Sequence, residues 1–109
     1  MKHVLIIYTG GTIGLTRTDK GYAPRSGYFR AALDAISDLH SSEMPAWDFM
    51  ELSPLLDSSN MTVYEWNRIA ELIAQQYDNY DGFVVLHGTD TMAYTASALS
   101  FMLGGLDKP

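Results

Sequence analysis

A repeated pattern constrains the fold of this chain more than any other feature: a short apolar run that closes on small, polar residues and is followed by a helical pattern. His3 to Tyr8 is the first such run and ends at Thr9-Gly10-Gly11. Phe83 to Leu86 is the last and ends at His87-Gly88. Compact apolar runs of this length are typical of buried strands, and the unbroken second run favours an interior strand that is covered on both faces.

The stretches between these runs carry further signals. Trp47 to Leu52 alternates roughly between apolar and polar residues and predicts another strand, which Ser53-Pro54 is expected to stop. Arg17 to Arg25 has little apolar content and holds both glycine and proline, so it predicts a mobile loop.

Two amphipathic patterns predict helices. The first begins with Ser26 as its N-cap and ends near Leu39. The second begins at Thr62, which forms a capping box with Glu65, and ends near Tyr80. The apolar stripe of the first helix consists of Phe29, Ala32, Leu33 and Ile36, and that of the second of Val63, Trp66, Ile69, Ala70, Ile73 and Tyr77.

A last helix, capped by Asp90 or Thr91, is predicted to run to about Leu103 and to end at Gly104-Gly105. It is apolar nearly all round, so we expect neighbouring segments to cover it on several sides. The remaining large side chains of the helix and strand stripes, which include Trp47, Trp66 and Met102, are predicted to be core.

Strands that alternate with helices predict an α/β fold, a three-layer parallel sheet with helices on both faces. Ligands of such sheets bind beyond the carboxyl ends of the strands. Three loops of small and polar residues follow the predicted strands: Thr9 to Gly14, Ser53 to Asn60, and Gly88 to Thr91. We expect these three loops to meet.

Composition excludes several classes of protein. The 109 residues include no cysteine, which rules out disulfides and cysteine-ligated zinc. His3, His40 and His87 lie too far apart in sequence to indicate a metal site. The 13 acidic residues outnumber the 7 Lys and Arg, which argues against a nucleic-acid partner. The first apolar run is too short for a membrane span or an export signal, so the expected location is the cytoplasm.

Each loop has a plain and a chemical interpretation. Thr9 to Gly14 is either a tight turn or a place where the backbone approaches a ligand, and phosphate binding is disfavoured because no Lys-Ser or Lys-Thr follows the glycines. Thr89-Asp90-Thr91 is either a helix cap or a hydroxyl nucleophile beside a carboxylate. Asp57-Ser58-Ser59-Asn60 is either a polar loop or a site for a small zwitterion. Tyr22 and His87 are expected to be a partly packed surface residue and a satisfied buried residue.

Taken together, Tyr8 to Gly14, Asp57-Ser58-Ser59 and Leu86 to Met92 resemble the bacterial-type L-asparaginase/glutaminase family, and most closely its cytoplasmic type I branch. The sequences TGGTIG and HGTDTM carry this resemblance. It implies an enzyme that hydrolyses L-asparagine to L-aspartate and ammonia through a threonine nucleophile, without a metal or an organic cofactor. It also implies a homo-oligomer that has neither nucleic-acid nor membrane partners.

The resemblance assigns roles to individual residues. Thr12 matches the nucleophile, and Tyr22 lies in the loop that closes over substrate and would orient or activate it. Thr89 and Asp90 match a second catalytic cluster, which in the family also contains a lysine further along the chain. The family's substrate-holding loop matches Asp57, Ser58 and Ser59, which would bind the α-carboxylate and the α-amino group, the latter shared with Asp90.

Family members are much longer, so residues 1–109 are expected to be the N-terminal part of the α/β domain, without the C-terminal domain. Two other interpretations stay open. One is a non-catalytic α/β module that binds a small anion or a nucleotide. The other, within the family, is a glutaminase or a subunit of a transfer-RNA-dependent amidotransferase. Ammonia release from asparagine would distinguish an enzyme from the non-catalytic module. An amidotransferase subunit is expected to carry an extra N-terminal domain.

Overall fold

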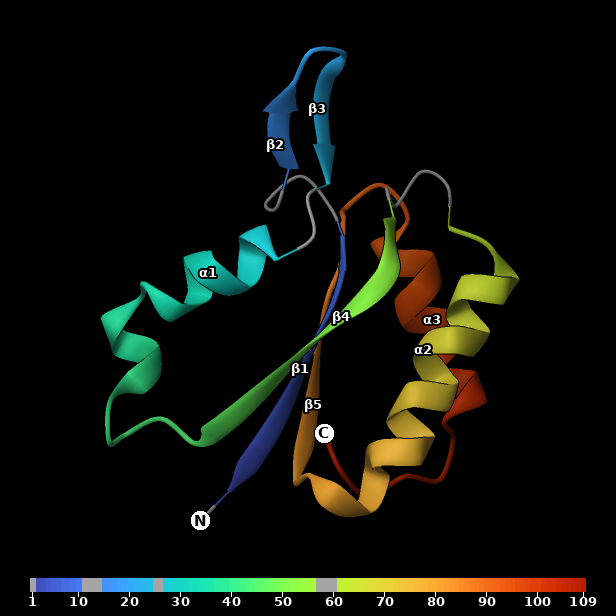
Figure 1. Ribbon diagram of the computed structural model, residues 1–109. Helices are drawn as coiled ribbons and strands as arrows, with labels where there is room; N and C mark the ends of the chain where they lie inside the picture. The colour runs from blue at the N-terminus through green and yellow to red at the C-terminus, as the bar shows by residue number, and fades with distance from the viewer. Residues whose placement is uncertain (1, 11–14, 25–26, 57–60) are drawn as a thin grey trace.

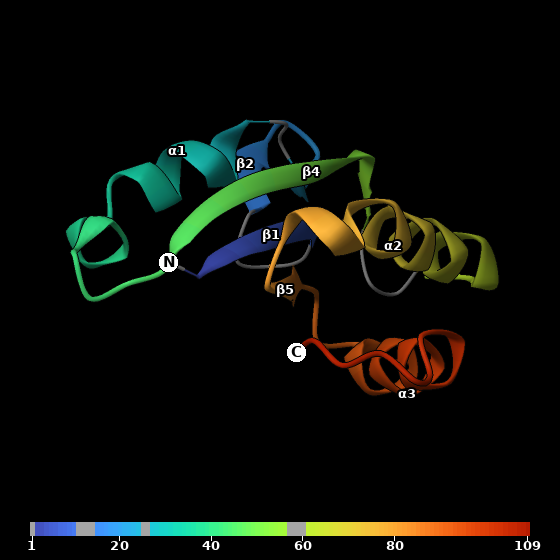
Figure 2. The ribbon, with the colours of Figure 1, turned by 90° about the horizontal axis from the view of Figure 1, so that it is seen from below.

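The computed structural model describes residues 2–10, 15–24, 27–56 and 61–109. A parallel sheet with the strand order β4-β1-β5 forms its centre (Figure 1). Its strands are β1 (His3–Gly10), β4 (Ala46–Leu56) and β5 (Gly82–Leu86). Seen from below, helix α1 lies on one side of the sheet and helices α2 and α3 on the other (Figure 2). The predicted parallel α/β architecture with helices on both faces is confirmed.

Strand β1 occupies the middle of the sheet, so both of its edges are paired. Tyr8, near its carboxyl end, pairs with Glu51 of β4 on one side and with Leu86 of β5 on the other. Side chains alternate along the strand. Accordingly, Leu5 and Ile7 are fully buried in a cluster with α2, while Tyr8 is fully buried in a second cluster with α1.

Strand β4 is longer than the sequence predicts. It continues through Ser53-Pro54 to Leu56, which pairs with Gly10 after a shift of register. The prediction that Ser53-Pro54 stops the strand is therefore wrong. The reason is position: β4 lies at the edge of the sheet, where a strand has one unpaired side and can hold a proline that lacks an N–H group.

Strand β5 is predicted to lie in the interior, yet within the described residues it forms the other edge of the sheet. The side chain of Val84 is 45% exposed, because α1 covers the opposite half of that face. The N–H of Phe83 donates to the carbonyl of Pro109 at 2.9 Å along the outer edge of β5. An unbroken apolar run thus does not distinguish a central strand from this edge strand.

Helix α1 (Tyr28–Asp34) is much shorter than the predicted helix. It begins after Gly27, whereas the predicted cap, Ser26, lies outside the described residues. A 3₁₀ turn at Ser37–His40 follows instead of further α-helix. Ile36 has an extended backbone between the two, and its side chain is 46% exposed, so it does not belong to the buried stripe. Exposed Ala32 does not belong to it either, whereas Phe29 and Leu33 do.

Helix α2 (Val63–Gln76) follows its sequence signals closely. The predicted capping box is present, with the N–H of Thr62 donating to Glu65 Oε2 at 2.9 Å. Ile69, Ala70 and Ile73 are buried as predicted, while Val63 is 60% exposed because it precedes the first full turn. A 3₁₀ turn at Tyr77–Asn79 continues the helix toward its predicted end near Tyr80.

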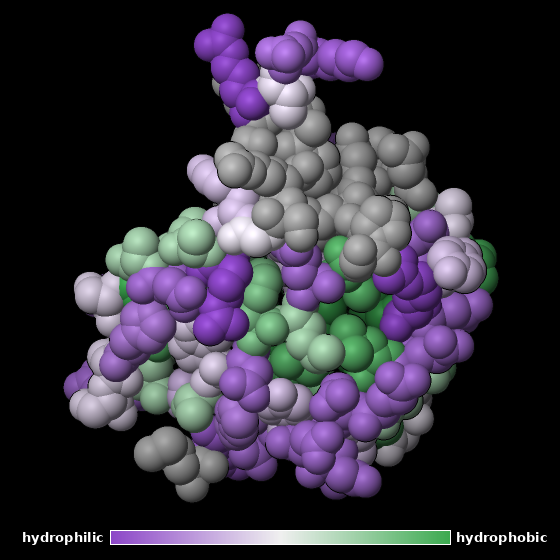
Figure 3. Space-filling view, viewed as in Figure 1, coloured by the Kyte–Doolittle hydropathy of each residue, from purple (hydrophilic) through white to green (hydrophobic). Residues whose placement is uncertain are grey.

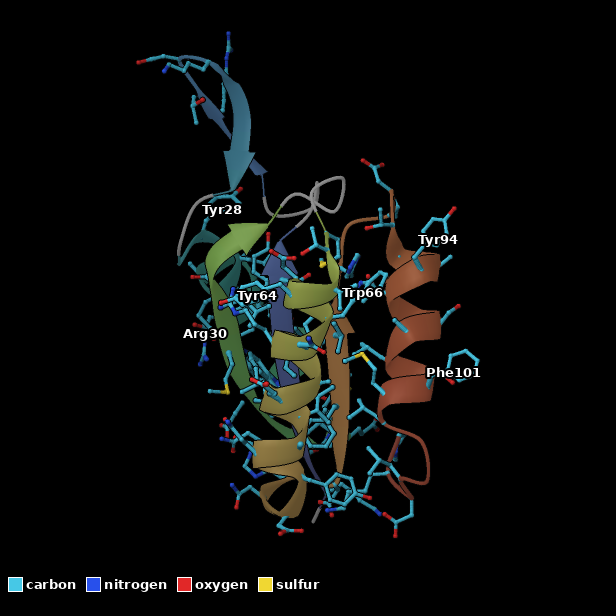
Figure 4. The ribbon with its side chains drawn as sticks, turned by 90° about the vertical axis from the view of Figure 1, so that its right-hand side faces the viewer. Tyr28, Arg30, Tyr64, Trp66, Tyr94 and Phe101 are labelled. Carbon is cyan, nitrogen blue, oxygen red and sulfur yellow. The ribbon has the colours of Figure 1, made fainter. Side chains whose placement is uncertain are left out.

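Helix α3 (Met92–Met102) packs beside α2, and Trp66 of α2 lies between them (Figure 4). The indole Nε1 of Trp66 donates to the buried hydroxyl of Thr95 at 2.8 Å. Tyr94 and Phe101, 69% and 87% exposed, point away from the body (Figure 4). The predicted cover on several sides and the predicted core position of Met102 are both wrong, because the described residues cover one side of α3 only.

Residues 17–24 form part of a hairpin, whereas the sequence predicts an irregular loop over 17–25; residue 25 lies outside the described residues. Strands β2 (Leu15–Thr18) and β3 (Gly21–Pro24) pair as an antiparallel hairpin that projects from the sheet (Figure 1). Gly21 has a φ of 108°, which favours glycine, and the hydroxyl of Thr18 donates to its carbonyl at 2.6 Å. A two-stranded ribbon needs little apolar content when neither face is covered, so the low hydrophobicity of the segment was a poor guide.

Candidate active site

The candidate site lies at the carboxyl edge of the sheet. The strands are parallel and adjacent, so their last residues, Gly10, Leu56 and Leu86, lie along one edge, as the sequence predicts. In Figure 1 this is the edge from which the hairpin projects. Residues 11–14 and 57–60, which follow two of the strands, lie outside the described residues. The described part of the site therefore consists of the strand ends, the connection from β5 to α3, and the hairpin.

Thr9 ties the end of β1 to the end of β5. Its side chain is 1% exposed, and its hydroxyl donates to the carbonyl of Leu86 at 2.8 Å. Gly10 follows with a φ of 120°, a conformation that side-chain-bearing residues rarely adopt. Gly10 thus has the glycine backbone conformation that the tight-turn interpretation requires, while the rest of the predicted turn lies outside the described residues. The same geometry fixes where the chain leaves the sheet toward Thr12.

The connection from β5 to α3 places two polar side chains at the surface of this edge. Gly88 is buried, whereas Thr89 and Asp90 are exposed. Thr91 occupies the N-cap position of α3, but its side chain makes no capping hydrogen bond within the described part of the chain, so the capping interpretation holds for the position of Thr91 only. Thr89 and Asp90 are therefore placed where a small molecule at the strand ends can reach them.

His87, directly after the end of β5, is half-buried, and one of its ring nitrogens has a hydrogen-bond partner among the described residues. Nδ1 lies 2.5 Å from the carbonyl oxygen of Gly88, and because a carbonyl can only accept, Nδ1 is the donor. Nε2 is buried and has no hydrogen-bond partner among the residues that the structure describes. The prediction of a satisfied buried histidine is thus only partly correct, because the residue is half-buried and one of its two ring nitrogens has a partner among the described residues.

Tyr8 is the buried polar residue that the sequence analysis treated only as strand. Its ring stacks on Phe29 at 4.5 Å between centroids. Burial raises the pKa of its phenol above the ordinary value, and the negative charge of Glu51 raises that pKa further. The phenol therefore stays protonated at neutral pH, and its oxygen has no partner within the described ranges. The signal in the sequence that could have identified Tyr8 as a candidate site residue is a polar ring near the end of a buried strand.

The remaining residues assigned by resemblance are placed unequally. Tyr22 lies on β3, opposite Arg17 of β2. Thr12, and the substrate-loop residues Asp57, Ser58 and Ser59, lie outside the described residues. The structure consequently tests which strand ends come together and does not test contacts between the assigned side chains.

Within the described ranges, no three His, Asp or Glu side chains gather in a way that could hold a metal ion. In the same residues no helix has the length and apolar character needed to cross a membrane. Neither observation identifies a bound group at the carboxyl edge of the sheet.

Comparison with known proteins adds what the geometry alone leaves open. Residues 3–109 match the family described as "Asparaginase, N-terminal". The chain belongs to this asparaginase family. It is similar to L-asparaginase 1 of Escherichia coli K12, with 56% identity over 108 residues that cover 99% of this chain and 32% of that protein.

Solved structures of asparaginases have the same fold. The crystal structure of L-asparaginase I from Vibrio cholerae is 53% identical with a TM-score of 0.82, covering 92% of this chain and 30% of that one. The thermostable L-asparaginase from Thermococcus kodakarensis is 37% identical with a TM-score of 0.71, covering 91% of this chain and 29% of that one. This asparaginase-family chain thus spans about a third of the length of the relatives that it matches.

Proposed function

We propose that the protein containing this chain is an L-asparaginase, which converts L-asparagine and water to L-aspartate and ammonia. The observation that carries the proposal is that Thr9-Gly10 and His87-Gly88, the starts of two loops with asparaginase motifs, leave neighbouring parallel strands side by side. Membership of the asparaginase family and 56% identity to an L-asparaginase support it. Residues 1–109 form the N-terminal part of its α/β domain.

Thr12 is the nucleophile in this proposal. Its hydroxyl oxygen attacks the side-chain amide carbon of asparagine, its proton passes to the departing nitrogen, and ammonia leaves as the C–N bond breaks. The resulting ester is then hydrolysed by water, which regenerates the hydroxyl and releases aspartate. Tyr22, from the hairpin, orients or activates the nucleophile. Thr89 and Asp90 form the second cluster, together with the lysine that the family carries further along its chain.

Substrate is held by the loop that follows β4. Asp57, Ser58 and Ser59 bind its α-carboxylate and α-amino group, and Asp90 shares the amino group. No metal or organic cofactor takes part in this scheme. A support for the arrangement is that β4 and β5 flank β1, so the loops after both strands start on either side of the loop that carries Thr12.

The test is ammonia release from asparagine by the full-length protein and its variants. Thr12→Ala and Thr89→Val should each lose most turnover and keep the circular dichroism spectrum of the wild type, because both positions follow strands in the sequence and are expected to lie in loops. Ser100→Ala, which removes an exposed hydroxyl on α3, is the matched control. Glutamine is assayed in parallel to identify a glutaminase. Near-normal turnover in Thr12→Ala would remove that residue from the mechanism.

The isolated 109-residue chain should turn over asparagine far more slowly than the full-length protein, because it holds only part of the proposed site. Its exposed apolar side chains on α3 also favour self-association. Light scattering and ammonia release on both forms test this, and parent-like turnover by a monomer would contradict it. A homo-oligomeric assembly and a cytoplasmic location remain predictions for the full-length protein, to be checked by light scattering and cell fractionation.

A further inference from the structure

Glu51 joins three elements near the candidate site. It lies on β4 directly opposite Tyr8 of β1, close to the carboxyl edge of the sheet. Both of its carboxylate oxygens accept a hydrogen bond from the backbone N–H of Gly27, each at 3.2 Å. Gly27 is the residue from which α1 begins. The carboxylate therefore fixes the start of α1 to the edge strand of the sheet.

The backbone at Gly27 depends on this bond. Gly27 has a φ of 79°, in the left-handed region, and no side chain caps the helix. Its carbonyl accepts from the N–H of Ala31 at 3.3 Å as the helix starts, while its own N–H points away from the helix to Glu51. A carboxylate acceptor makes a stronger bond to a backbone N–H than a neutral group does. Glu51 thus supplies the anchor that α1 lacks in its own sequence.

A second contact holds the same end of α1. Phe29, in the first turn, stacks on the buried ring of Tyr8. The pKa of Tyr8 is raised by its burial and by the nearby charge of Glu51, so the phenol stays neutral and adds no charge of its own beside the carboxylate. The stacked rings set the distance of α1 from the sheet. The Glu51 bond sets the direction from which the chain enters the helix.

The entry to α1 is also the exit from the hairpin. Strand β3 ends at Pro24, and Tyr28, the first residue of α1, lies near the base of the hairpin (Figure 4). The other end of the hairpin starts from β1, whose last residue, Gly10, is held in the sheet. Among the described residues, strand pairing thus holds the chain before the hairpin, and the side chain of Glu51 holds the chain after it.

We propose that Glu51 is a positioning residue that anchors the returning end of the β2–β3 hairpin through Gly27 and so sets the position of the hairpin backbone, which carries Tyr22, relative to the sheet. Its effect on catalysis rests on the proposed function, whereas the anchor itself does not. Glu51 acts through the backbone of Gly27 and not on substrate. The ligand chemistry at the site is unchanged by this role.

The experiment compares Glu51→Ala and Glu51→Gln with wild type in the full-length protein. Glu71→Gln, which removes one exposed carboxylate from α2, is the matched control. Hydrogen exchange followed by mass spectrometry reads the peptides that cover residues 15–30 and, separately, those of β1 and β5. Limited trypsin digestion, which cleaves after Arg17 and Lys20, gives a second reading of the hairpin.

Glu51→Ala should exchange faster in residues 15–30 with β1 and β5 unchanged, and its kcat/KM for asparagine should fall about tenfold as the competent hairpin position becomes less populated. Glu51→Gln keeps one carbonyl acceptor, so its exchange rate in residues 15–30 and its kcat/KM should lie between those of Glu51→Ala and wild type. A general loss of folding would instead speed exchange in β1 and β5. If Glu51→Ala does not fold, Glu51→Gln alone decides by the same readings.

Unchanged exchange in residues 15–30, or unchanged kcat/KM beside an active wild type, overturns the positioning role. Failure of the proposed function gives a different result: the wild type releases no ammonia from asparagine. In that case the exchange of residues 15–30 still tests the anchor, because it needs no substrate.

Discussion

The two faces of the sheet are built on different principles. On one, α2 is 14 residues long, carries its own capping box and buries Ile69 and Ile73 against β1. On the other, α1 has seven residues, begins at a glycine and is held by Tyr8 and Glu51 of the sheet. Figure 3 shows apolar side chains gathered between β4 and α2, while the surface over α1 is mixed. The α2 face is specified by its own sequence, and the α1 face by the sheet beneath it.

The largest effect is expected in the α2 core. Ile69→Ala should lower the free energy of unfolding by about 2–5 kcal/mol, because the fully buried side chain leaves a cavity among well-packed neighbours. Val63→Ala on the same helix is the control, since its side chain is 60% exposed. Denaturant unfolding followed by circular dichroism measures both. Equal losses in the two variants would contradict the assignment of the core.

At the start of α1, Gly27→Ala should cost about 1–2 kcal/mol, because the left-handed φ of 79° is unfavourable for alanine. An added Cβ meets no atom within 4 Å, so the cost comes from the backbone and not from a clash. Gly104→Ala, at a glycine without a positive φ, is the comparison. The same unfolding experiment applies, and a neutral Gly27→Ala would show that this helix start adapts readily.

On the α2 face, Thr62→Ala should lower stability by about 1 kcal/mol through loss of the capping box. The hydrogen bond from the Thr62 hydroxyl, the largest cause, lowers the pKa of Glu65 in the folded protein. Because the pKa of Glu65 is lower in the folded than in the unfolded protein, its ionisation stabilises the fold at pH values above the ordinary pKa of 4.5. This stabilisation is lost as the pH falls through the folded pKa. The gap between wild type and Thr62→Ala should therefore narrow on acidification. Melting curves from pH 7 to pH 3 measure that gap, and a constant gap would count against the capping box.

The smallest change is expected from Tyr8→Phe. The phenol oxygen is buried without a partner among the described residues, so removing it deletes no bond in that part of the chain and should shift stability by less than about 0.5 kcal/mol in either direction. Tyr8→Ala, which also loses the stack on Phe29, should by contrast be strongly destabilising. Thermal unfolding distinguishes the two. A large loss in Tyr8→Phe would mean that the hydroxyl holds more than the described contacts show.

This contrast explains which predictions from sequence succeed. The capping box, the apolar strands and the central part of the α2 stripe are local signals, and they appear in the structure, whereas Val63 of the predicted stripe is exposed. The predicted length of α1 is wrong, because the helix ends at Asp34 and Ile36 is extended, and the predicted cap, Ser26, lies outside the described residues. The contact of Gly27 with Glu51, a residue distant in sequence, is not visible in a local pattern. The prediction that Pro54 stops the strand is wrong because the effect of a proline depends on whether its strand lies at an edge of the sheet.

The candidate site divides in the same way. The alternation of strands and helices predicts that the loops after β1, β4 and β5 start from one edge, and the strand order confirms it for the strand ends. The hairpin and the buried phenol of Tyr8 were not predicted, since both depend on pairing or burial that a linear pattern does not report. The roles of Thr12, Tyr22, Thr89 and Asp90 stay predictions until the kinetic experiments are made.

The central place of β1 has a consequence for synthesis on the ribosome. β1 leaves the ribosome before β4 and β5, whose residues begin at Ala46 and Gly82, and the bond from the N–H of His3 to Asp81 spans 78 residues. At about 5–20 residues per second, translation of that distance takes about 4–16 s. Throughout this interval one edge of β1 lacks the strand that pairs with it. The nascent chain therefore presents an unpaired strand edge, at which chaperones can act, until β5 has left the exit tunnel.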